Sequence, residues 1–163
     1  MGLRDDIKNN KIPSHFEILE EFKKADINFI ITYNMAGRYY SWGGTFPTLD
    51  LIVENTLPNL LRIKRLLDLP LNKFKKLRIG GKISLIGNLG MKVLNLWTEV
   101  GYRRYEDINY VMYDGYKIIS KRDLIDTIKY ESVHTEIRAK LALEKDVFKN
   151  KDIALAVYRS IKS

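Results

Sequence analysis

One carboxylate stands out as a residue that could do chemistry. Asp50 lies in Thr48-Leu49-Asp50-Leu51-Ile52-Val53-Glu54, between apolar residues that predict a buried strand. Alternation predicts that Leu49, Leu51 and Val53 share one face and that Asp50, Ile52 and Glu54 share the other. A carboxylate in such a place is costly unless it has partners. Asp50 is therefore a candidate catalytic acid and metal ligand, or else an ordinary acid at a strand end.

Basic residues interleaved with aromatic residues form a second group of candidate functional residues. Cations beside rings suit phosphate contact combined with base stacking, whereas aromatic residues in a half-buried loop also serve as core cover. The candidate binding residues near rings are Arg38, Trp42, Gly43, Gly44, Arg103 and Arg104. Further basic clusters occur at Arg62-Lys64-Arg65, at Lys73-Lys75-Lys76-Arg78 and at Lys121-Arg122.

Composition narrows the classes of function. The chain has 163 residues, 45% of them hydrophobic, which is enough for a real core. It has no Cys and two His, so disulfides and thiolate metal sites are excluded and a His-rich site is not expected. The net charge of +8 favours a polyanion partner, the alternative being a solvated basic surface without a specific partner. No apolar run reaches the ~18 residues of a membrane span, and residues 1–11 are too polar for a secretory signal, so we expect no membrane partner and a cytoplasmic location.

The elements that must position these residues can be read along the chain. After a loose lead-in over residues 1–12, Ser14 and Glu17 form a capping box that predicts a helix over residues 14–25. We expect strands over residues 27–33 and 48–53, an intervening loop or helical turn, and a helix from Thr56 to about Pro70. In that helix the predicted apolar stripe is Leu57, Leu60, Leu61, Lys64 and Leu67.

Two hairpins and several helices complete the prediction. Gly80-Gly81 predicts a tight turn within residues 77–86, and Asp114-Gly115 predicts another within residues 108–119. Residues 91–97 fit either a helix or a strand. A cap at Ser120 starts a helical end, with further helices expected over residues 135–146 and 150–161. Without a repeat or a flexible linker, we expect a single α+β domain over residues 1–163.

This order of elements resembles the minimal nucleotidyltransferase-fold proteins of the polymerase-beta-like superfamily, of the type associated with toxins and antitoxins. The resemblance spans about residues 14–160 and implies a small mixed sheet flanked by helices, with C-terminal helices. In that family two acids at positions i and i+2 of one strand, with a third acid on a neighbouring strand, hold two Mg²⁺ ions. A Gly pair upstream brings backbone N–H groups to the triphosphate.

The chain departs from this pattern at the working positions. Asp50 matches the first acid, Ile52 falls on the second, and Ser84 falls on or near the third. The Gly pair falls near Tyr33-Asn34, and Gly37 or Gly43-Gly44 could substitute only with a reshaped loop. Lys129 matches a helix lysine of the family, and Lys151-Asp152 matches a pair at the start of its final helix; both also fit ordinary solvated helix positions.

Three functions remain open from the sequence. The first is a catalytically degenerate nucleotidyltransferase-like protein, a pseudoenzyme, that binds nucleic acid or a nucleotide through a basic surface without a cofactor. The second is a divergent enzyme that transfers NMP to RNA or protein with Mg²⁺ or Mn²⁺, using Asp50 with Glu54 or Glu99. The third is a structural module with a protein partner, such as an antitoxin or assembly component.

Overall fold

The structure is a computed structural model that describes residue 3 and residues 15–41, 48–87 and 92–131. The chain divides into two compact units, Met1–Leu124 and Ile125–Ser163. Apart from the helix that begins at residue 121, the elements described below belong to the first unit. They include both the main sheet and the residues around Asp50. Whether the chain acts as one domain stays a prediction.

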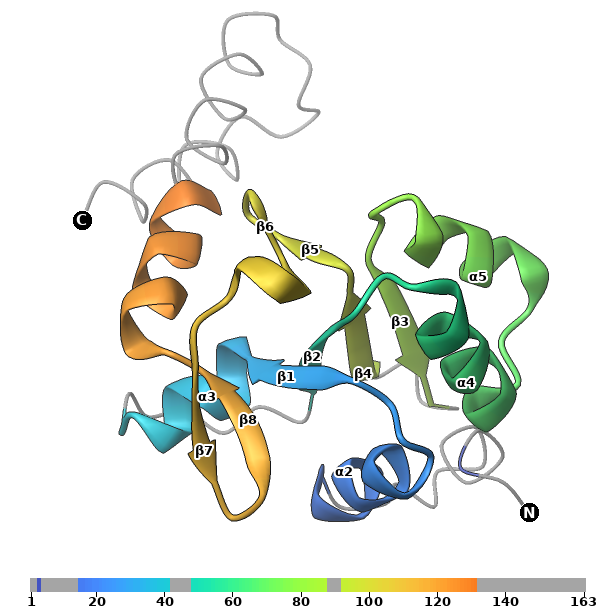
Figure 1. Ribbon diagram of the computed structural model, residues 1–163, viewed down its shortest axis with the longest axis horizontal. Coiled ribbons are helices and arrows are strands. Elements are labelled where there is room, and N and C mark those ends of the chain that lie inside the picture. Colours follow the sequence, from blue (N-terminus) through green and yellow to red (C-terminus); the bar gives the residue numbers. More distant parts are fainter. Residues whose placement is uncertain (1–2, 4–14, 42–47, 88–91, 132–163) are drawn as a thin grey trace, which may run out of the picture. The chain divides into compact units, whose positions relative to one another are not determined.

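A six-stranded mixed sheet with flanking helices forms this unit, which confirms the α+β prediction (Figure 1). The strand order is β3-β4-β2-β1-β8-β7, with β1–β8 and β2–β4 parallel and the other neighbours antiparallel. The strands are β1 (Phe29–Thr32), β2 (Leu49–Val53), β3 (Ile83–Ile86), β4 (Lys92–Trp97), β7 (Tyr110–Tyr113) and β8 (Tyr116–Ile119). A separate hairpin joins β5 (Glu99–Val100) to β6 (Arg103–Arg104).

The helices of this unit are α2 (His15–Lys24), α3 (Tyr33–Tyr39), α4 (Leu57–Leu67) and α5 (Leu71–Arg78), and a short 3-10 turn covers Tyr105–Asp107. Helix α5 lies beside α4 and next to β3 (Figure 1). A further helix begins at residue 121, where the Asp123 N–H donates to the Ser120 hydroxyl, as the predicted cap requires. No helix among the described residues is long and apolar enough to cross a bilayer.

One face of strands β1, β2, β3 and β4 is wholly apolar. The strand registers place on it Phe29, Ile31, Leu49, Leu51, Val53, Ile83, Leu85, Leu94 and Leu96. Helix α2 packs against this face, with the Phe22 ring edge-on to Phe29 at 5.7 Å between centroids. Each fully buried Leu or Ile contributes about 1.5–3 kcal/mol by leaving water. Burial of this face therefore fixes which residues occupy the opposite face, where Asp50 lies.

A buried asparagine ties α4 to the sheet. The Asn59 side chain accepts a hydrogen bond from the Asn28 N–H at 2.7 Å and donates to the backbone oxygens of Asn28 and Glu54 at 3.1 and 2.9 Å. These bonds join the helix to the start of β1 and the end of β2. They satisfy backbone groups that would otherwise be buried without partners.

The stripe predicted for α4 is wrong in part. Leu57 and Leu61 are exposed, and the buried positions are Asn59, Leu60, Ile63 and Leu67. The predicted stripe therefore missed Ile63, which belongs to the same helical face as Leu60 and Leu67.

The predicted hairpin over residues 77–86 is also wrong. Leu77 and Arg78 end helix α5, and Gly80-Gly81 caps it: the Gly81 N–H donates to the Lys76 oxygen at 2.9 Å and the Gly80 N–H to the Leu77 oxygen at 3.2 Å. This pair of bonds is the Schellman motif, and Gly80 has the positive φ, +95°, that the motif requires. The same Gly pair suits either structure, and the run Lys73–Arg78 favours the helix. Strand β3 then pairs with β4, which resolves residues 91–97 as a strand.

The remaining predictions in this region agree with the structure. Helix α2, strand β2 and the hairpin β7–β8 lie where the sequence indicated them, and Asp114 and Gly115 both adopt positive φ as a tight turn demands. The predicted helices over residues 135–146 and 150–161 lie outside the described residues.

We expect Gly80→Ala to lower the free energy of unfolding by about 1–2 kcal/mol, because a Cβ is unfavourable at this positive φ. Chemical denaturation followed by circular dichroism measures the change. Asn72→Ala, at an exposed position in the first turn of the same helix, is the control and should leave stability nearly unchanged. Equal stability of both variants would contradict the capping role of Gly80.

Candidate functional site

Four polar side chains form a row across the sheet, on the face opposite the apolar one. Thr32 of β1 lies opposite Asp50 of β2, Asp50 opposite Asn95 of β4, and Asn95 opposite Ser84 of β3. Thr32, Asp50 and Asn95 are buried, and Asp50 is only 3% exposed. We call these four residues the polar row. Such a row must be internally bonded to be stable in a core.

The polar row is held by two hydrogen bonds. The Asn95 amide Nδ2 donates to Asp50 Oδ1 at 2.8 Å, and the Ser84 hydroxyl donates to Asn95 Oδ1 at 2.6 Å. Both ends of the Asn95 amide are therefore used. The Thr32 hydroxyl has no hydrogen-bond partner among the described residues.

Burial raises the pKa of the Asp50 carboxyl above its ordinary value of 3.8. The Asn95 amide, the Trp97 indole, the Asn34 backbone N–H and the Lys82 ammonium each favour the ionised form and oppose this rise. The Trp97 Nε1–H acts through proximity, since it makes no hydrogen bond of standard geometry with the described residues. Asp50 is thus a desolvated carboxyl with mostly neutral partners.

The described residues around Asp50 do not fit a two-metal centre. Ile52, at the second acid position of the family pattern, is fully buried among apolar residues. Asn95, the residue directly opposite Asp50 on β4, is an amide, and Ser84 lies one strand further away. Within the described residues, no group of three or more His, Cys, Asp or Glu side chains could hold a metal ion.

The two acids predicted to assist Asp50, Glu54 and Glu99, interact with other residues. Glu54 accepts hydrogen bonds from the Asn28 amide at 3.2 Å and the Thr56 hydroxyl at 3.1 Å. Glu99 forms an ion pair with Arg104, with 3.4 Å between Oε1 and Nε. Both acids thus have other local partners.

The chain leaves β1 beside Asp50 through a strained residue. Tyr33 has φ +46°, a region that non-Gly residues seldom adopt, at the position where the family pattern expects glycine. Its ring packs on Trp97 with 5.3 Å between centroids, and Lys82 Nζ lies 5.0 Å from the centroid of the same indole. This packing holds in place a backbone conformation that costs about 1–3 kcal/mol by itself.

A basic surface is the second candidate site. Helices α4 and α5 and the turn between them carry one acidic residue, Asp68, and seven basic ones, which we call the basic surface: Arg62, Lys64, Arg65, Lys73, Lys75, Lys76 and Arg78. This segment therefore bears a net charge of +6 in a chain of net charge +8. The structure places these two sequence clusters on neighbouring helices.

Three cations of the basic surface donate to neutral oxygens. Arg78 donates to the Asn55 backbone and side-chain oxygens, Lys73 to the Ser84 backbone oxygen, and Arg62 to the Asp26 backbone oxygen. Hydrogen bonds to neutral acceptors orient these side chains without cancelling their charge. The two helices and their turn therefore carry six more basic than acidic residues, an excess of charge that favours polyanion partners.

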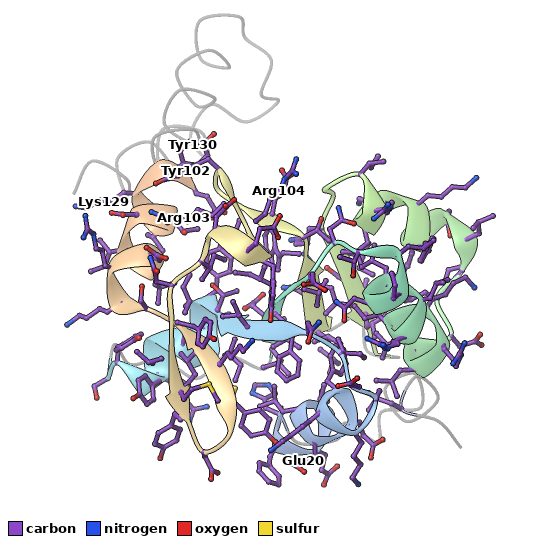
Figure 2. The ribbon with its side chains drawn as sticks, viewed as in Figure 1. Glu20, Tyr102, Arg103, Arg104, Lys129 and Tyr130 are labelled. Atoms are coloured by element: carbon purple, nitrogen blue, oxygen red, sulfur yellow. The ribbon has the colours of Figure 1, made fainter. Side chains whose placement is uncertain are left out.

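The other predicted binding residues are scattered. Arg38 is exposed on α3. Arg103 and Arg104 form β6 and follow Tyr102 in the sequence (Figure 2). Arg103 forms an ion pair at 3.3 Å with the buried Asp123, which also accepts a hydrogen bond from the Asn109 N–H. Arg104 is mostly exposed. Lys129 is exposed and belongs to the second unit. Trp42, Gly43, Gly44 and Lys151 lie outside the described residues.

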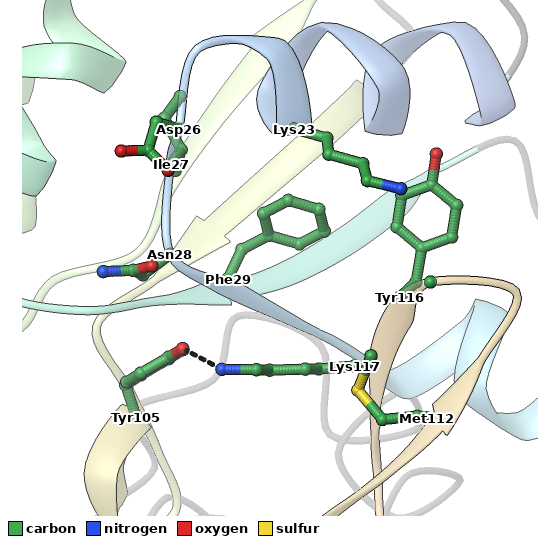
Figure 3. A pocket seen from close by; sticks show the side chains of 10 residues that line it. Lys23, Asp26, Ile27, Asn28, Phe29, Tyr105, Met112, Tyr116 and Lys117 are labelled. Atoms are coloured by element: carbon green, nitrogen blue, oxygen red, sulfur yellow. Dashed lines mark hydrogen bonds between the residues drawn. The ribbon is translucent and has the colours of Figure 1, made fainter.

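A pocket of about 150 Å³ lies where the starts of β1 and β8 diverge (Figure 3). Its lining includes Lys23, Phe29, Tyr105, Tyr116 and Lys117. Lys117 Nζ donates to the Tyr105 hydroxyl at 3.0 Å, a bond that raises the pKa of Lys117, and lies 4.8 Å from the Tyr110 ring centroid. Lys23 Nζ lies 5.2 Å from the Tyr116 ring centroid. Both ammonium groups of the pocket thus already contact phenol rings.

Comparison with known proteins does not assign this chain to a family. No protein-family model matches the chain, and no curated protein matches it. A search of solved structures finds the Megavirus polyadenylate synthase, with a TM-score of 0.45 and 17% sequence identity over 99% of this chain. The chain spans 35% of the length of that enzyme.

We expect Asp50→Asn to raise the free energy of unfolding at neutral pH, because the amide keeps an acceptor for Asn95 and removes a buried charge. Because the folded-state pKa of Asp50 is raised, the contribution of this carboxyl to wild-type stability is complete below pH 3.8. That contribution is lost as the pH rises through the folded-state pKa. The advantage of the variant should therefore shrink as the pH is lowered towards 3.8. Denaturant unfolding of both proteins over this pH range measures it.

Asp50→Ala serves as the matched comparison. It also removes the charge, but leaves the buried Asn95 amide without its acceptor, so it should be less stable than Asp50→Asn by about 1–3 kcal/mol. Equal stability of the two variants would contradict the structural role of the Asp50–Asn95 bond.

Proposed function

We propose that this chain is a nucleotidyltransferase-like protein that binds nucleic acid through the basic surface and does not carry out two-metal catalysis. The observation that carries the proposal is the charge of α4, α5 and their turn, seven basic residues against one acid. An excess of cations on adjacent helices suits a phosphate backbone, since binding releases the counterions condensed on it.

The dimensions of the basic surface agree with a backbone ligand. Helix α4 has 11 residues and is therefore about 16 Å long, a span over which one strand presents several phosphates. Lys75, Lys76 and Arg78 also border an open hollow with Phe74 and Ile79, and Ile79 is 84% exposed. Apolar contact beside cations favours unpaired bases over a phosphate backbone alone.

The polar row supports the second half of the proposal. A buried acid bonded to an amide, with an isoleucine two residues further along the strand, offers one carboxylate where two-metal chemistry needs several. A divergent enzyme that uses Asp50 with Mg²⁺ or Mn²⁺ is the second candidate. The Asn34 backbone N–H favours it, because this group stabilises the ionised form of the Asp50 carboxyl. A purely structural module is the third, and absence of nucleic-acid binding would favour it.

We expect the double variant Lys75→Glu/Lys76→Glu to bind a labelled single-stranded RNA more weakly than wild type. If each lysine neutralises one phosphate, the slope of log K against log salt should fall in magnitude by about 1.4, because the variant releases fewer counterions. Fluorescence anisotropy across a salt series, repeated with duplex DNA and with a mononucleotide, measures the affinity and the preferred ligand.

Lys23→Glu/Lys24→Glu is the matched control, because it reverses two adjacent exposed lysines in the last turn of another helix, α2. Its change in net charge equals that of Lys75→Glu/Lys76→Glu, so it measures the effect of net charge alone, wherever the charge lies. An equal loss of affinity in both variants would contradict a localised site, and no salt-sensitive binding by wild type would contradict nucleic-acid binding altogether.

A further inference from the structure

Strand β7 is one of the two edge strands of the main sheet, and its side chains are exposed. Its four residues, Tyr110, Val111, Met112 and Tyr113, are uncharged and 37–59% exposed. An uncharged outer strand offers its free backbone groups to another strand. We propose that β7 pairs antiparallel with β7 of a second copy of this chain.

The hairpin register tells which backbone groups face outwards. The two-residue turn Asp114-Gly115 is flanked by Tyr113 and Tyr116, which therefore form a hydrogen-bonded pair. Alternation makes Val111–Ile118 the next bonded pair, and the Ser120 N–H bonded to the Asn109 oxygen at 2.8 Å continues the pattern. The N–H and C=O groups of Tyr110 and Met112 consequently point away from β8.

One dimer register uses all of these groups. If a two-fold axis passes beside Val111, Tyr110 of each copy lies opposite Met112 of the other, and both residues of each pair exchange N–H and C=O. The register is self-complementary, with a ring against a thioether on one face and Val111 against its own copy on the other. This symmetry favours a second copy over an unrelated strand.

The other edge strand of the sheet, β3, has a charged side chain at its backbone. Lys73 Nζ donates to the Ser84 backbone oxygen of β3 at 3.1 Å. Charged side chains at an outer strand discourage pairing with another chain. Neither outer strand contains a charged residue or a proline, but among the described residues a lysine donates to the backbone of β3 and none donates to that of β7.

Disulfide trapping tests the register, because the chain has no native Cys. In the proposed dimer the two Val111 residues form a non-hydrogen-bonded pair with Cα atoms about 4.5 Å apart, a separation that a disulfide spans. We expect Val111→Cys to form a covalent dimer under mild oxidation at least about tenfold faster than the controls, since only it meets this geometric limit.

Two single-Cys controls separate the register from chance collision. Tyr113→Cys lies on the same strand, but its two copies would be offset by four residues, about 13 Å. Ile79→Cys is 84% exposed and far from β7 in the sequence. Trapping of Val111→Cys no faster than of Ile79→Cys would overturn the proposal, and faster trapping of Tyr113→Cys would overturn the register.

Met112→Pro tests the association without cross-linking. The Met112 N–H faces outwards, so proline should spare the β7–β8 bonds while blocking the partner strand. We expect sedimentation equilibrium to give the mass of two chains for wild type and one chain for the variant, with an unchanged circular dichroism spectrum. A wild-type mass of one chain at every concentration tested, or a dimer that survives Met112→Pro in a folded protein, would contradict pairing through this strand.

Discussion

The burial of the Asp50 carboxyl is the constraint on which the functional interpretation rests. A charged group in a sheet core must be bonded to something, and the parallel register of β2 with β4 supplies Asn95. The Ser84 hydroxyl then occupies the other end of that amide. The polar row thus spans four strands on one face, while their other face is wholly apolar. One oxygen of the Asp50 carboxyl is consequently already used as an acceptor.

The polar row and the basic surface are independent features with different chemistry. The row is built from one acid and three neutral side chains, and its acid has a raised pKa. The basic surface owes its character to the excess of cations on α4 and α5 and needs no titratable group in the core. The proposed attraction of a polyanion therefore does not depend on an assembled metal site.

Local signals predicted much of this fold. The Asp114-Gly115 turn and the apolar alternation around Asp50 each depend on nearby residues, and both were identified from the sequence. Asn95 was missed because its role arises from strand register, which no local pattern in residues 91–97 reveals. Gly80 was misassigned because a helix cap and a hairpin turn require the same positive φ. The apolar residue at position 52 was visible in the sequence, and the structure explains it as part of the core.

The most direct test of the proposed loss of two-metal catalysis is an NMR titration of the Asp50 carboxyl carbon, with and without Mg²⁺. We predict a pKa above 3.8 that Mg²⁺ does not change, because the carboxyl is desolvated and bonded to Asn95. A pKa at or below 3.8 would contradict a desolvated carboxyl, and a pKa that falls when Mg²⁺ is added would mean that Asp50 binds the metal. That result would contradict the proposed loss of catalysis and favour the divergent enzyme.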